Sequence, residues 1–327
     1  MYGVSITGTG SYLPPKILTN RDLEKMVDTT DEWITTRTGI KERRIAEDGV
    51  SSSDLAIEAS RIAIKEAGIL PKDIDVIITA TVTPDHSFPS TAANIQKEIK
   101  AVNAACFDLS AACSGFIYGL FCAKSFIESG NAKTVLLIGT ETMSKITNWK
   151  DRNTCVLFGD GAGAMVLTRT KKEDTNILSV YIGCDGNYGH LLKVEAGGSK
   201  LPVTKEVLDQ NLHLIQMCGK EVFKSAVNKM LDASRKALEM CNKKCSDLAL
   251  FIPHQANIRI IEAIAERLDL PRERVFINLD KYGNISAATT IIALDESRKS
   301  GMVKSGDLVE LVAFGAGFTW GAAVLQL

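Results

Sequence analysis

Cys113 is the residue of this chain whose side chain is best suited to covalent chemistry. It lies in Asp108-Leu-Ser-Ala-Ala-Cys113-Ser-Gly115, where a short apolar run and a group of small residues lead into a helical pattern. A cysteine in the first turn of a helix faces unpaired backbone N–H groups and the positive end of the helix dipole. We therefore expect its pKa to lie below the free value of about 8.5, which predicts a nucleophilic thiolate. The alternative is a small buried core residue, a common role of free cysteine.

Two more polar side chains stand at predicted junctions between strands and helices. His254 follows the apolar run 248–252, and Asn284 precedes a helical pattern at 285–300. Sites in open α/β sheets gather at the carboxyl ends of strands, which makes His254 a candidate site residue. His254 could also be a core histidine, and Asn284 could simply cap the following helix.

The elements that must position these residues alternate along the chain. Short apolar runs are typical of buried strands, and the longer segments between them have helical periodicity. The predicted strands are 76–80, 105–109, 134–138, 248–252, 274–277 and 308–312. The predicted helices are 52–67, 92–99, 113–129, 206–241, 258–268 and 285–300. This alternation predicts an α/β fold with parallel sheets covered by helices.

The two halves of the chain also resemble each other. Four short matches recur in the same order at an offset of about 172 residues, among them Asp75-Val-Ile-Ile and Asp247-Leu-Ala-Leu. Such a repeat indicates an internal duplication, with halves at 1–172 and 173–327. At this offset Asn284 corresponds to Cys113, so we expect the two helix starts to approach one central site.

Composition excludes several classes of protein. The chain has 327 residues, 45% of them hydrophobic and 24% charged, with a net charge of −1, which is ordinary for a soluble globular protein and gives no reason to expect nucleic acid binding. No stretch approaches the roughly 18 apolar residues that span a bilayer, and the first ten residues, which have no basic region, predict a strand and turn rather than a signal peptide. Eight scattered cysteines indicate free thiols in a reducing cytoplasm. We expect a cytoplasmic protein without a metal site or a membrane partner.

Six segments carry a resemblance to a known family: Asp31-Glu-Trp-Ile-Thr-Thr-Arg-Thr-Gly39, Ala111-Ala-Cys-Ser-Gly115, Val156-Leu-Phe-Gly-Asp-Gly-Ala-Gly163, Pro253-His-Gln-Ala-Asn257, Tyr282-Gly-Asn284 and Ala313-Phe-Gly-Ala-Gly-Phe-Thr-Trp-Gly321. With them the chain resembles the thiolase superfamily and, within it, the β-ketoacyl-acyl carrier protein synthase III family, essentially from end to end. The resemblance implies a thiolase-like fold. In this fold two duplicated α/β halves, with parallel-rich sheets layered with helices, surround a pseudo-two-fold axis.

The resemblance implies a decarboxylative Claisen condensation that starts fatty acid synthesis. A short-chain acyl-CoA, expected to be acetyl-CoA, would acylate Cys113, and malonyl-acyl carrier protein would then lose CO2 and give 3-oxoacyl-acyl carrier protein. His254 and Asn284 would stabilise the enolate, and the backbone N–H groups of Cys113 and Ala316 would form the oxyanion hole. Ala316 stands where relatives have glycine. CoA would be a substrate, and no cofactor is implied.

The resemblance also assigns residues to substrate binding. Trp33 and Arg152 would hold the adenine of CoA between them, Arg37 would reach its phosphates, and Asn257 would orient the pantetheine or a water. Phe88 would line the acyl pocket and favour a short primer.

Partner surfaces follow from the same resemblance. Arg259 and Lys224 would dock the acidic acyl carrier protein, as charge complementarity suggests. A homodimer would form through a strand of the N-terminal half, for which 102–109 is the candidate edge.

Two alternatives to this function remain. A related condensing enzyme could use longer, branched or specialised primers, and a non-catalytic paralogue could bind acyl groups or CoA without reaction. The retention of Cys113, His254 and Asn284 together favours an enzyme.

Overall fold

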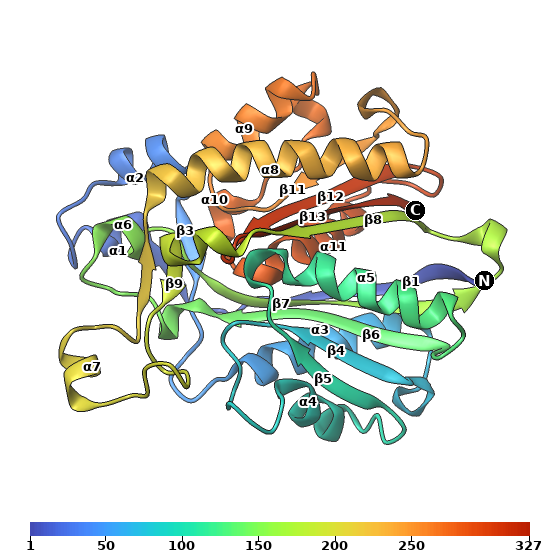
Figure 1. Ribbon diagram of the computed structural model, residues 1–327, viewed down its shortest axis with the longest axis horizontal. Helices are drawn as coiled ribbons and strands as arrows, with labels where there is room; N and C mark the ends of the chain where they lie inside the picture. The colour runs from blue at the N-terminus through green and yellow to red at the C-terminus, as the bar shows by residue number, and fades with distance from the viewer.

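The computed structural model describes all 327 residues, and its framework is two sheets separated by a pair of helices (Figure 1). The first sheet has the order β1 (Gly3–Tyr12), β7 (Asp160–Thr170), β6 (Thr134–Thr142), β4 (Val76–Ala80), β5 (Ala105–Leu109). The second has the order β11 (Leu250–Pro253), β12 (Leu308–Gly315), β13 (Thr319–Gln326), β8 (Ile177–Cys184). The first sheet is therefore drawn from residues before 171 and the second from residues after 176.

Helices form three layers around the two sheets. The central layer is α5 (Gly115–Glu128) and α11 (Thr289–Lys299), which are buried between the sheets. The outer layers are α3 (Ser52–Ala67) with α4 (Thr91–Ile99) on the first sheet, and α8 (Gly219–Met240) with α9 (Ile258–Arg267) on the second. These layers confirm the predicted α/β, thiolase-like architecture. None of the helices combines the length and apolar character needed to cross a membrane.

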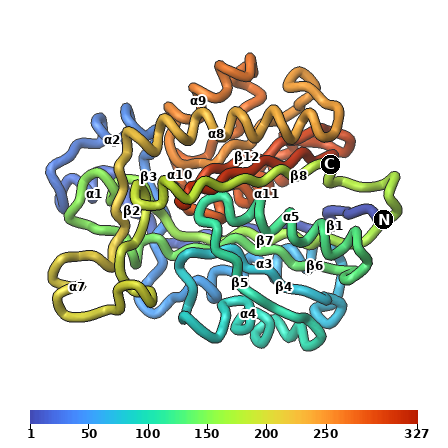
Figure 2. Tube along the Cα trace, viewed as in Figure 1, coloured from blue at the N-terminus to red at the C-terminus, as the bar shows by residue number.

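The short elements gather at one end of the sheets, the left side of the view in Figure 2. They are β2 (Ile17–Thr19), α1 (Asn20–Leu23), α2 (Asp31–Thr38), β3 (Glu42–Arg44), α6 (Arg152–Cys155), β9 (Leu192–Val194), α7 (Lys205–Asp209), β10 (Ile215–Met217) and α10 (Leu279–Tyr282). Several of them form the walls of the site described below.

The strand order repeats between the two sheets. Reading from the edge, β1-β7-β6-β4-β5 corresponds to β8-β13-β12-β11, and the position of β5 is taken in the second sheet by a single parallel bridge between Phe251 and Val275. The predicted strand at 274–277 is therefore wrong, because residues 272–274 form a 3₁₀ turn and only one residue pairs.

Two further sequence predictions need correction. The sheets are mixed rather than parallel-rich: three pairings are parallel and four are antiparallel. The predicted helix 206–241 is two helices, α7 and α8, separated by a turn and by β10, which pairs with β9. At the interruption Asn211 adopts a left-handed conformation, and the N–H of Ile215 donates to the carbonyl of Ile146, which is distant in the sequence, at 2.9 Å.

One buried carboxyl group of the second sheet makes stability depend on pH. Glu310 of β12 is fully buried, accepts one hydrogen bond from Ser234 at 2.9 Å, and has an unpartnered Oε1. Burial raises the pKa of Glu310 from 4.5 to about 8. The folded state thus binds a proton more tightly than the unfolded state, so this contribution to stability is complete below pH 4.5 and is lost as the pH rises through 8.

Replacing Glu310 with glutamine is therefore expected to remove a pH-dependent loss of stability. Relative to the unchanged chain, Glu310→Gln should gain on the order of 3–5 kcal/mol in free energy of unfolding between pH 5 and pH 9. Urea unfolding at both pH values measures the difference. Glu239→Gln, at an exposed position of α8, is the matched control, and equal pH slopes for the two variants would contradict the prediction.

Candidate active site

Cys113 lies between the two sheets at the start of a central helix. A 3₁₀ turn at Ala112–Ser114 follows β5 and leads into α5, and Ala112 has a φ of +48°. The Cys113 side chain is 8% exposed. Gly315, at the end of β12, comes so close that an added Cβ would lie 2.6 Å from the Cys113 nitrogen. Glycine is required there because the backbone of the second half touches that of the nucleophile.

The expected low pKa of Cys113 is wrong for the resting thiol. Burial, together with a smaller effect of the nearby negative charge of Glu141, raises its pKa to about 12. The Ser286 hydroxyl and the N–H of Cys113 itself lower it, but by less than burial raises it. The desolvation of a sulfur enclosed between two sheets outweighs the stabilisation that the helix start provides. The resting residue is a thiol.

His254 follows β11, as predicted, and its position is fixed on two sides. Its backbone N–H donates to the carbonyl of Val312 at 2.8 Å, and its Nδ1 lies 2.6 Å from the hydroxyl of Thr289. Burial lowers the pKa of His254 to about 3, so the imidazole is neutral at physiological pH. With Nδ1 bound to Thr289, Nε2 is the nitrogen left for other partners.

Asn284 is held so that its amide nitrogen is the available group. Its Oδ1 accepts the N–H of Ser286 at 2.8 Å, and its backbone bonds to Leu157 and Gly159 at 2.8 and 3.1 Å. The Nδ2 donors therefore remain for a ligand. Cys113 is the middle residue of the 3₁₀ turn Ala112–Ser114, and Ala287 is the middle residue of the equivalent turn Ser286–Ala288. The structural counterpart of Cys113 is therefore Ala287, and the predicted correspondence with Asn284 is wrong.

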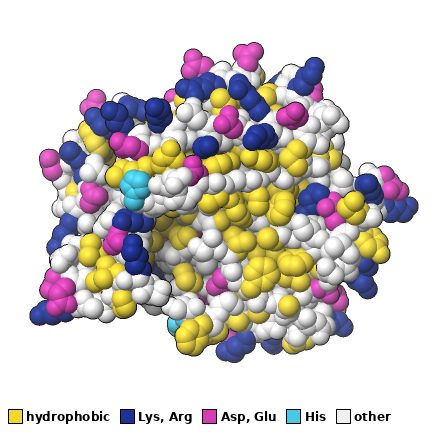
Figure 3. Space-filling model, viewed as in Figure 1, with side chains coloured by type: hydrophobic (Ala, Val, Ile, Leu, Met, Phe, Trp, Pro, Cys, Tyr) yellow, Lys and Arg dark blue, Asp and Glu magenta, His cyan; other side chains and the backbone are white.

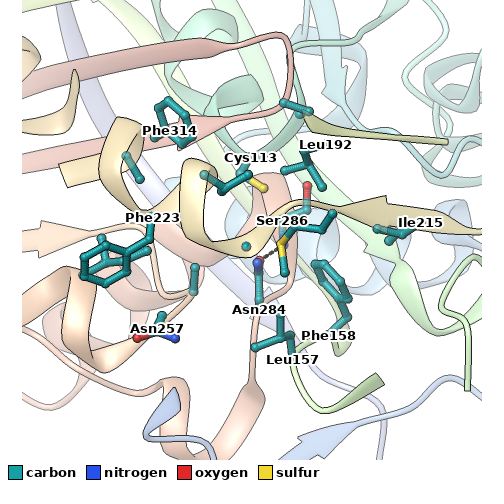
Figure 4. A pocket seen from close by; sticks show the side chains of 18 of the residues that line it. Cys113, Leu157, Phe158, Leu192, Ile215, Phe223, Asn257, Asn284, Ser286 and Phe314 are labelled. Carbon is teal, nitrogen blue, oxygen red and sulfur yellow. Dashed lines mark hydrogen bonds between the residues drawn. The ribbon is translucent and has the colours of Figure 1, made fainter. Parts of the chain in front are cut away.

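One cavity brings the three residues together. It has a volume of about 690 Å³, and its lining includes Cys113, His254 and Asn284 (Figure 4). Ala316 also lines it, and its φ lies outside the left-handed region, so the alanine adopts its backbone conformation without needing the freedom of glycine. The Ala316 N–H donates to no other group of the chain. The sequence-predicted thiol, imidazole and carboxamide thus share one site.

Trp33 lies at the cavity with two arginines against its ring. The guanidinium carbons of Arg37 and Arg152 are 4.7 and 4.9 Å from the ring centroid. Arg152 also donates to the carbonyl of Asp28 at 2.8 Å. An adenine between Trp33 and Arg152 would need them about 7 Å apart, since each stacking contact takes about 3.5 Å. The arginine contacts the tryptophan directly, and adenine binding would require Arg152 to move.

Asn257 and two exposed cations lie near the same opening. Asn257 lines the cavity, but its side chain caps α9 through Arg259 N at 2.9 Å and donates to the carbonyl of Arg37 at 3.1 Å. Arg259 and Lys224 are exposed and have no ion-pair partner, and neither lines the cavity. The opening is a hollow bordered by Lys and Arg side chains (Figure 3).

Phe88 does not line the cavity of its own chain, contrary to the expected role in the acyl pocket. Its side chain is 86% exposed. The residue lies on the loop after β4, whose end is tied to the edge strand because Thr91 N donates to Asp108 of β5 at 2.6 Å. Phe88 therefore points away from the chain's own site, next to the exposed edge of the first sheet.

Several residues of the site were not found from the sequence. Lys193 and Lys220 line the opening, and Ser286, Thr289 and Glu141 surround the three central residues. Serine, threonine and a strand glutamate have no distinctive spacing, so only their proximity identifies them. Lys220 could have been noticed as a cation near the start of a predicted helix. No group of three or more His, Cys, Asp or Glu side chains suited to a metal ion occurs.

The two layered halves and a cysteine, histidine and asparagine on one buried cavity define a condensing enzyme of the thiolase fold. Family models of 3-oxoacyl-[acyl-carrier-protein] synthase III match residues 107–186, and those of its C-terminal region match 238–327. The chain belongs to this family and is an acyltransferase-type condensing enzyme.

Relatives support this assignment over the whole chain. The chain is 58% identical to β-ketoacyl-[acyl-carrier-protein] synthase III of Caldanaerobacter subterraneus subsp. tengcongensis, covering 98% of this chain and 97% of the relative. Its structure is similar to that of the synthase III of Aquifex aeolicus, with a TM-score of 0.93, 50% identity and coverage of 99% and 100%. A priming β-ketosynthase of the R1128 polyketide pathway has a TM-score of 0.92 at 36% identity, with coverage of 99% and 96%.

Proposed function

We propose that the chain catalyses the decarboxylative condensation of a short-chain acyl-CoA, expected to be acetyl-CoA, with malonyl-acyl carrier protein. The products are 3-oxoacyl-acyl carrier protein, CoA and CO2, as the first step of fatty acid synthesis. The observation that carries this proposal is the shared cavity of Cys113, His254 and Asn284, in which the asparagine amide is turned to donate. The names of the relatives support the substrate class.

The first step is transfer of the acyl group to Cys113. The sulfur attacks the thioester carbonyl, an acyl-cysteine forms, and the thiol proton leaves with the departing CoA as CoA-SH. The negative oxygen of the tetrahedral intermediate would be held by the N–H groups of Cys113 and Ala316, of which the second has no other partner. A close approach of the Gly315 backbone to Cys113 supports this pairing.

The second step creates an enolate that needs hydrogen-bond donors. When malonyl-acyl carrier protein loses CO2, negative charge develops on its thioester oxygen. The enolate carbon then attacks the acyl-cysteine carbonyl, the carbon–sulfur bond to Cys113 breaks, and the released sulfur takes up a proton from water. Asn284 Nδ2 and a protonated His254 Nε2 would stabilise that oxygen, at about 3–4 kcal/mol each. A neutral histidine supplies this proton once the Thr289 hydroxyl turns its one hydrogen from the Ser286 carbonyl to Nδ1. CoA serves as a substrate, and the step requires no cofactor.

Substrate entry uses the cationic opening. CoA carries phosphates and an adenine, and Arg37, Trp33, Lys193 and Lys220 line the cavity wall where these groups would pass. The exposed and unpaired Arg259 and Lys224 on the neighbouring helices support docking of an acidic carrier protein there. Asn257 would contribute to CoA binding indirectly, because its side-chain amide donates to the carbonyl of Arg37 and so positions that arginine.

We infer a homodimer from the exposed edge of the first sheet. Strand β5 pairs only with β4, and apolar side chains gather over the face where β5 and α5 lie (Figure 3). Val102 and Phe88 are 71% and 86% exposed beside this edge. An acyl-pocket role for Phe88 requires a second copy to receive the side chain. A solution mass of two chains is the supporting result.

A panel of CoA esters tests the proposed function. With malonyl-acyl carrier protein present, acetyl-CoA should give the fastest CO2 release, and mass spectrometry should show one acetyl group on the protein when malonyl-acyl carrier protein is omitted. Faster turnover with longer or branched esters would support the alternative primer specificity. No acylation by any ester would eliminate both enzymatic functions and favour a non-catalytic binding protein.

A further inference from the structure

Ser286 occupies a strained position beside the reactive cysteine. It is 1% exposed and has a φ of +44°, in the left-handed region that glycine or asparagine adopts more easily. Ala112, directly before Cys113, has a φ of +48° at the corresponding turn of the first half. A residue kept in such a conformation at a site indicates that its side chain or backbone is used there.

The backbone of Ser286 connects the other two central residues. Its N–H donates to Asn284 Oδ1 at 2.8 Å, and its carbonyl accepts from the Thr289 hydroxyl at 3.1 Å. The same hydroxyl lies 2.6 Å from His254 Nδ1. The position of Ser286 is therefore fixed by contacts to the asparagine and, through one threonine, to the histidine.

The Ser286 hydroxyl, unlike the backbone groups of the same residue, has no hydrogen-bond partner in the resting structure. Its Oγ is inaccessible to solvent, although the residue lines the cavity. Figure 4 shows Ser286 on the same wall of the cavity as Cys113. A buried hydroxyl without a partner is unfavourable and uncommon, so its retention calls for a partner that arises during the reaction.

Two groups are close enough to become that partner, the Cys113 sulfur and the Glu141 carboxyl. Glu141 Oε2 already accepts from the backbone N–H of Val82 at 3.0 Å and from the Thr83 hydroxyl at 2.6 Å. Its Oε1 faces the N–H of Ala287 at 3.5 Å. The glutamate is satisfied without Ser286, whereas the Cys113 sulfur receives no side-chain hydrogen bond in the resting structure, and the Ser286 hydroxyl is the side-chain group that lowers its pKa.

We propose that Ser286 is a further catalytic residue, whose hydroxyl donates a hydrogen bond to the Cys113 thiolate during acyl transfer. A thiol is a weak acceptor and a thiolate a strong one, so the bond forms as the proton leaves. The thiol proton ends on the sulfur of the departing CoA, as in the first step described above. The role of this hydrogen bond in acyl transfer rests on the proposed function. The direction agrees with the effect of Ser286 on the pKa of Cys113, which is to lower it against burial.

Two substitutions separate the hydroxyl from the strained backbone. Ser286→Ala removes the hydroxyl and keeps a Cβ at positive φ, whereas Ser286→Gly removes the hydroxyl and relieves the backbone strain, which favours folding. Thr290→Val is the matched control, because the Thr290 hydroxyl is also buried and unpartnered, on α11. Melting temperatures confirm that each variant is folded.

The readout is alkylation of Cys113 by iodoacetamide between pH 6 and pH 10, followed at the Cys113 peptide by mass spectrometry. Both Ser286 variants should react about tenfold more slowly at neutral pH, with the rate profile shifted to higher pH. Thr290→Val should match the unchanged chain. Unchanged profiles in both Ser286 variants would overturn the proposal, as would a defect in only one of them, which would point to backbone geometry.

This assay uses no thioester, so it is independent of the proposed function. An unchanged chain that no CoA ester acylates would refute the proposed function while leaving the alkylation profiles interpretable. A normal acylation rate in both Ser286 variants, together with unshifted alkylation, would refute only the role of Ser286.

Discussion

Replacing Cys113 with alanine is expected to abolish acylation of the protein by acetyl-CoA. No other nucleophile of the cavity is placed against the Cys113 N–H and the Gly315 loop, so a covalent intermediate cannot form. Condensation should fall by at least about 10³-fold, as expected when a nucleophile that acts in concert with its neighbours is removed. Intact-protein mass spectrometry after mixing with acetyl-CoA measures acylation, and CO2 release with malonyl-acyl carrier protein measures turnover.

Cys155→Ala is the matched control for this substitution. Cys155 is likewise buried, and burial raises its pKa to about 11, yet it does not line the cavity. Its removal should leave acetylation intact. An acetyl group that persists on the Cys113→Ala protein would place the nucleophile elsewhere.

Changing Asn284 to aspartate is expected to separate the two chemical steps. Aspartate retains the oxygen that accepts the Ser286 N–H at 2.8 Å, but it loses the amide donors and turns a carboxylate toward the enolate. Condensation should fall by about 10²–10³-fold, since one preorganised donor is lost and like charges oppose each other. Acylation of Cys113 should be much less affected, and single-turnover acetylation compared with CO2 release measures the difference.

The order of two variants makes this prediction specific. Asn284→Ala loses the donor without adding charge, so it should condense faster than Asn284→Asp if the enolate oxygen lies against this side chain. The reverse order, or an equal loss of acylation and condensation, would contradict a role confined to the second step.

The sequence predicts those elements whose signals are local. Helix α3 begins after Ser51, which forms a capping box with Asp54, and ends at Gly68 with a φ of +66°, so its predicted bounds of 52–67 agree with the structure. The helix predicted at 206–241 fails because long-range pairing competes with helical periodicity. The segment 215–217 bonds to Ile146 and to β9, and such contacts leave no mark in the local pattern.

Some features of the site can likewise be predicted from the local sequence, whereas others depend on contacts between distant residues. Cys113, His254 and Asn284 could be proposed because each stands at a junction between a predicted strand and helix. The raised pKa of Cys113 could not be predicted from the sequence. The helix start that lowers it is visible in the local sequence, whereas the burial that raises it comes from a sheet formed by distant residues. The exposure of Phe88 and the hydroxyl of Ser286 depend on which surfaces face each other, and this is a property of the folded chain alone.

The matching turns at Ala112 and Ser286 differ in the residue that follows each of them. The first turn presents the Cys113 sulfur to the cavity, whereas the second carries at the equivalent position the methyl group of Ala287, which lies close to Gly115. The paired turns therefore offer one attachment point for an acyl group instead of two, so we expect a stoichiometry of at most one acyl group per chain.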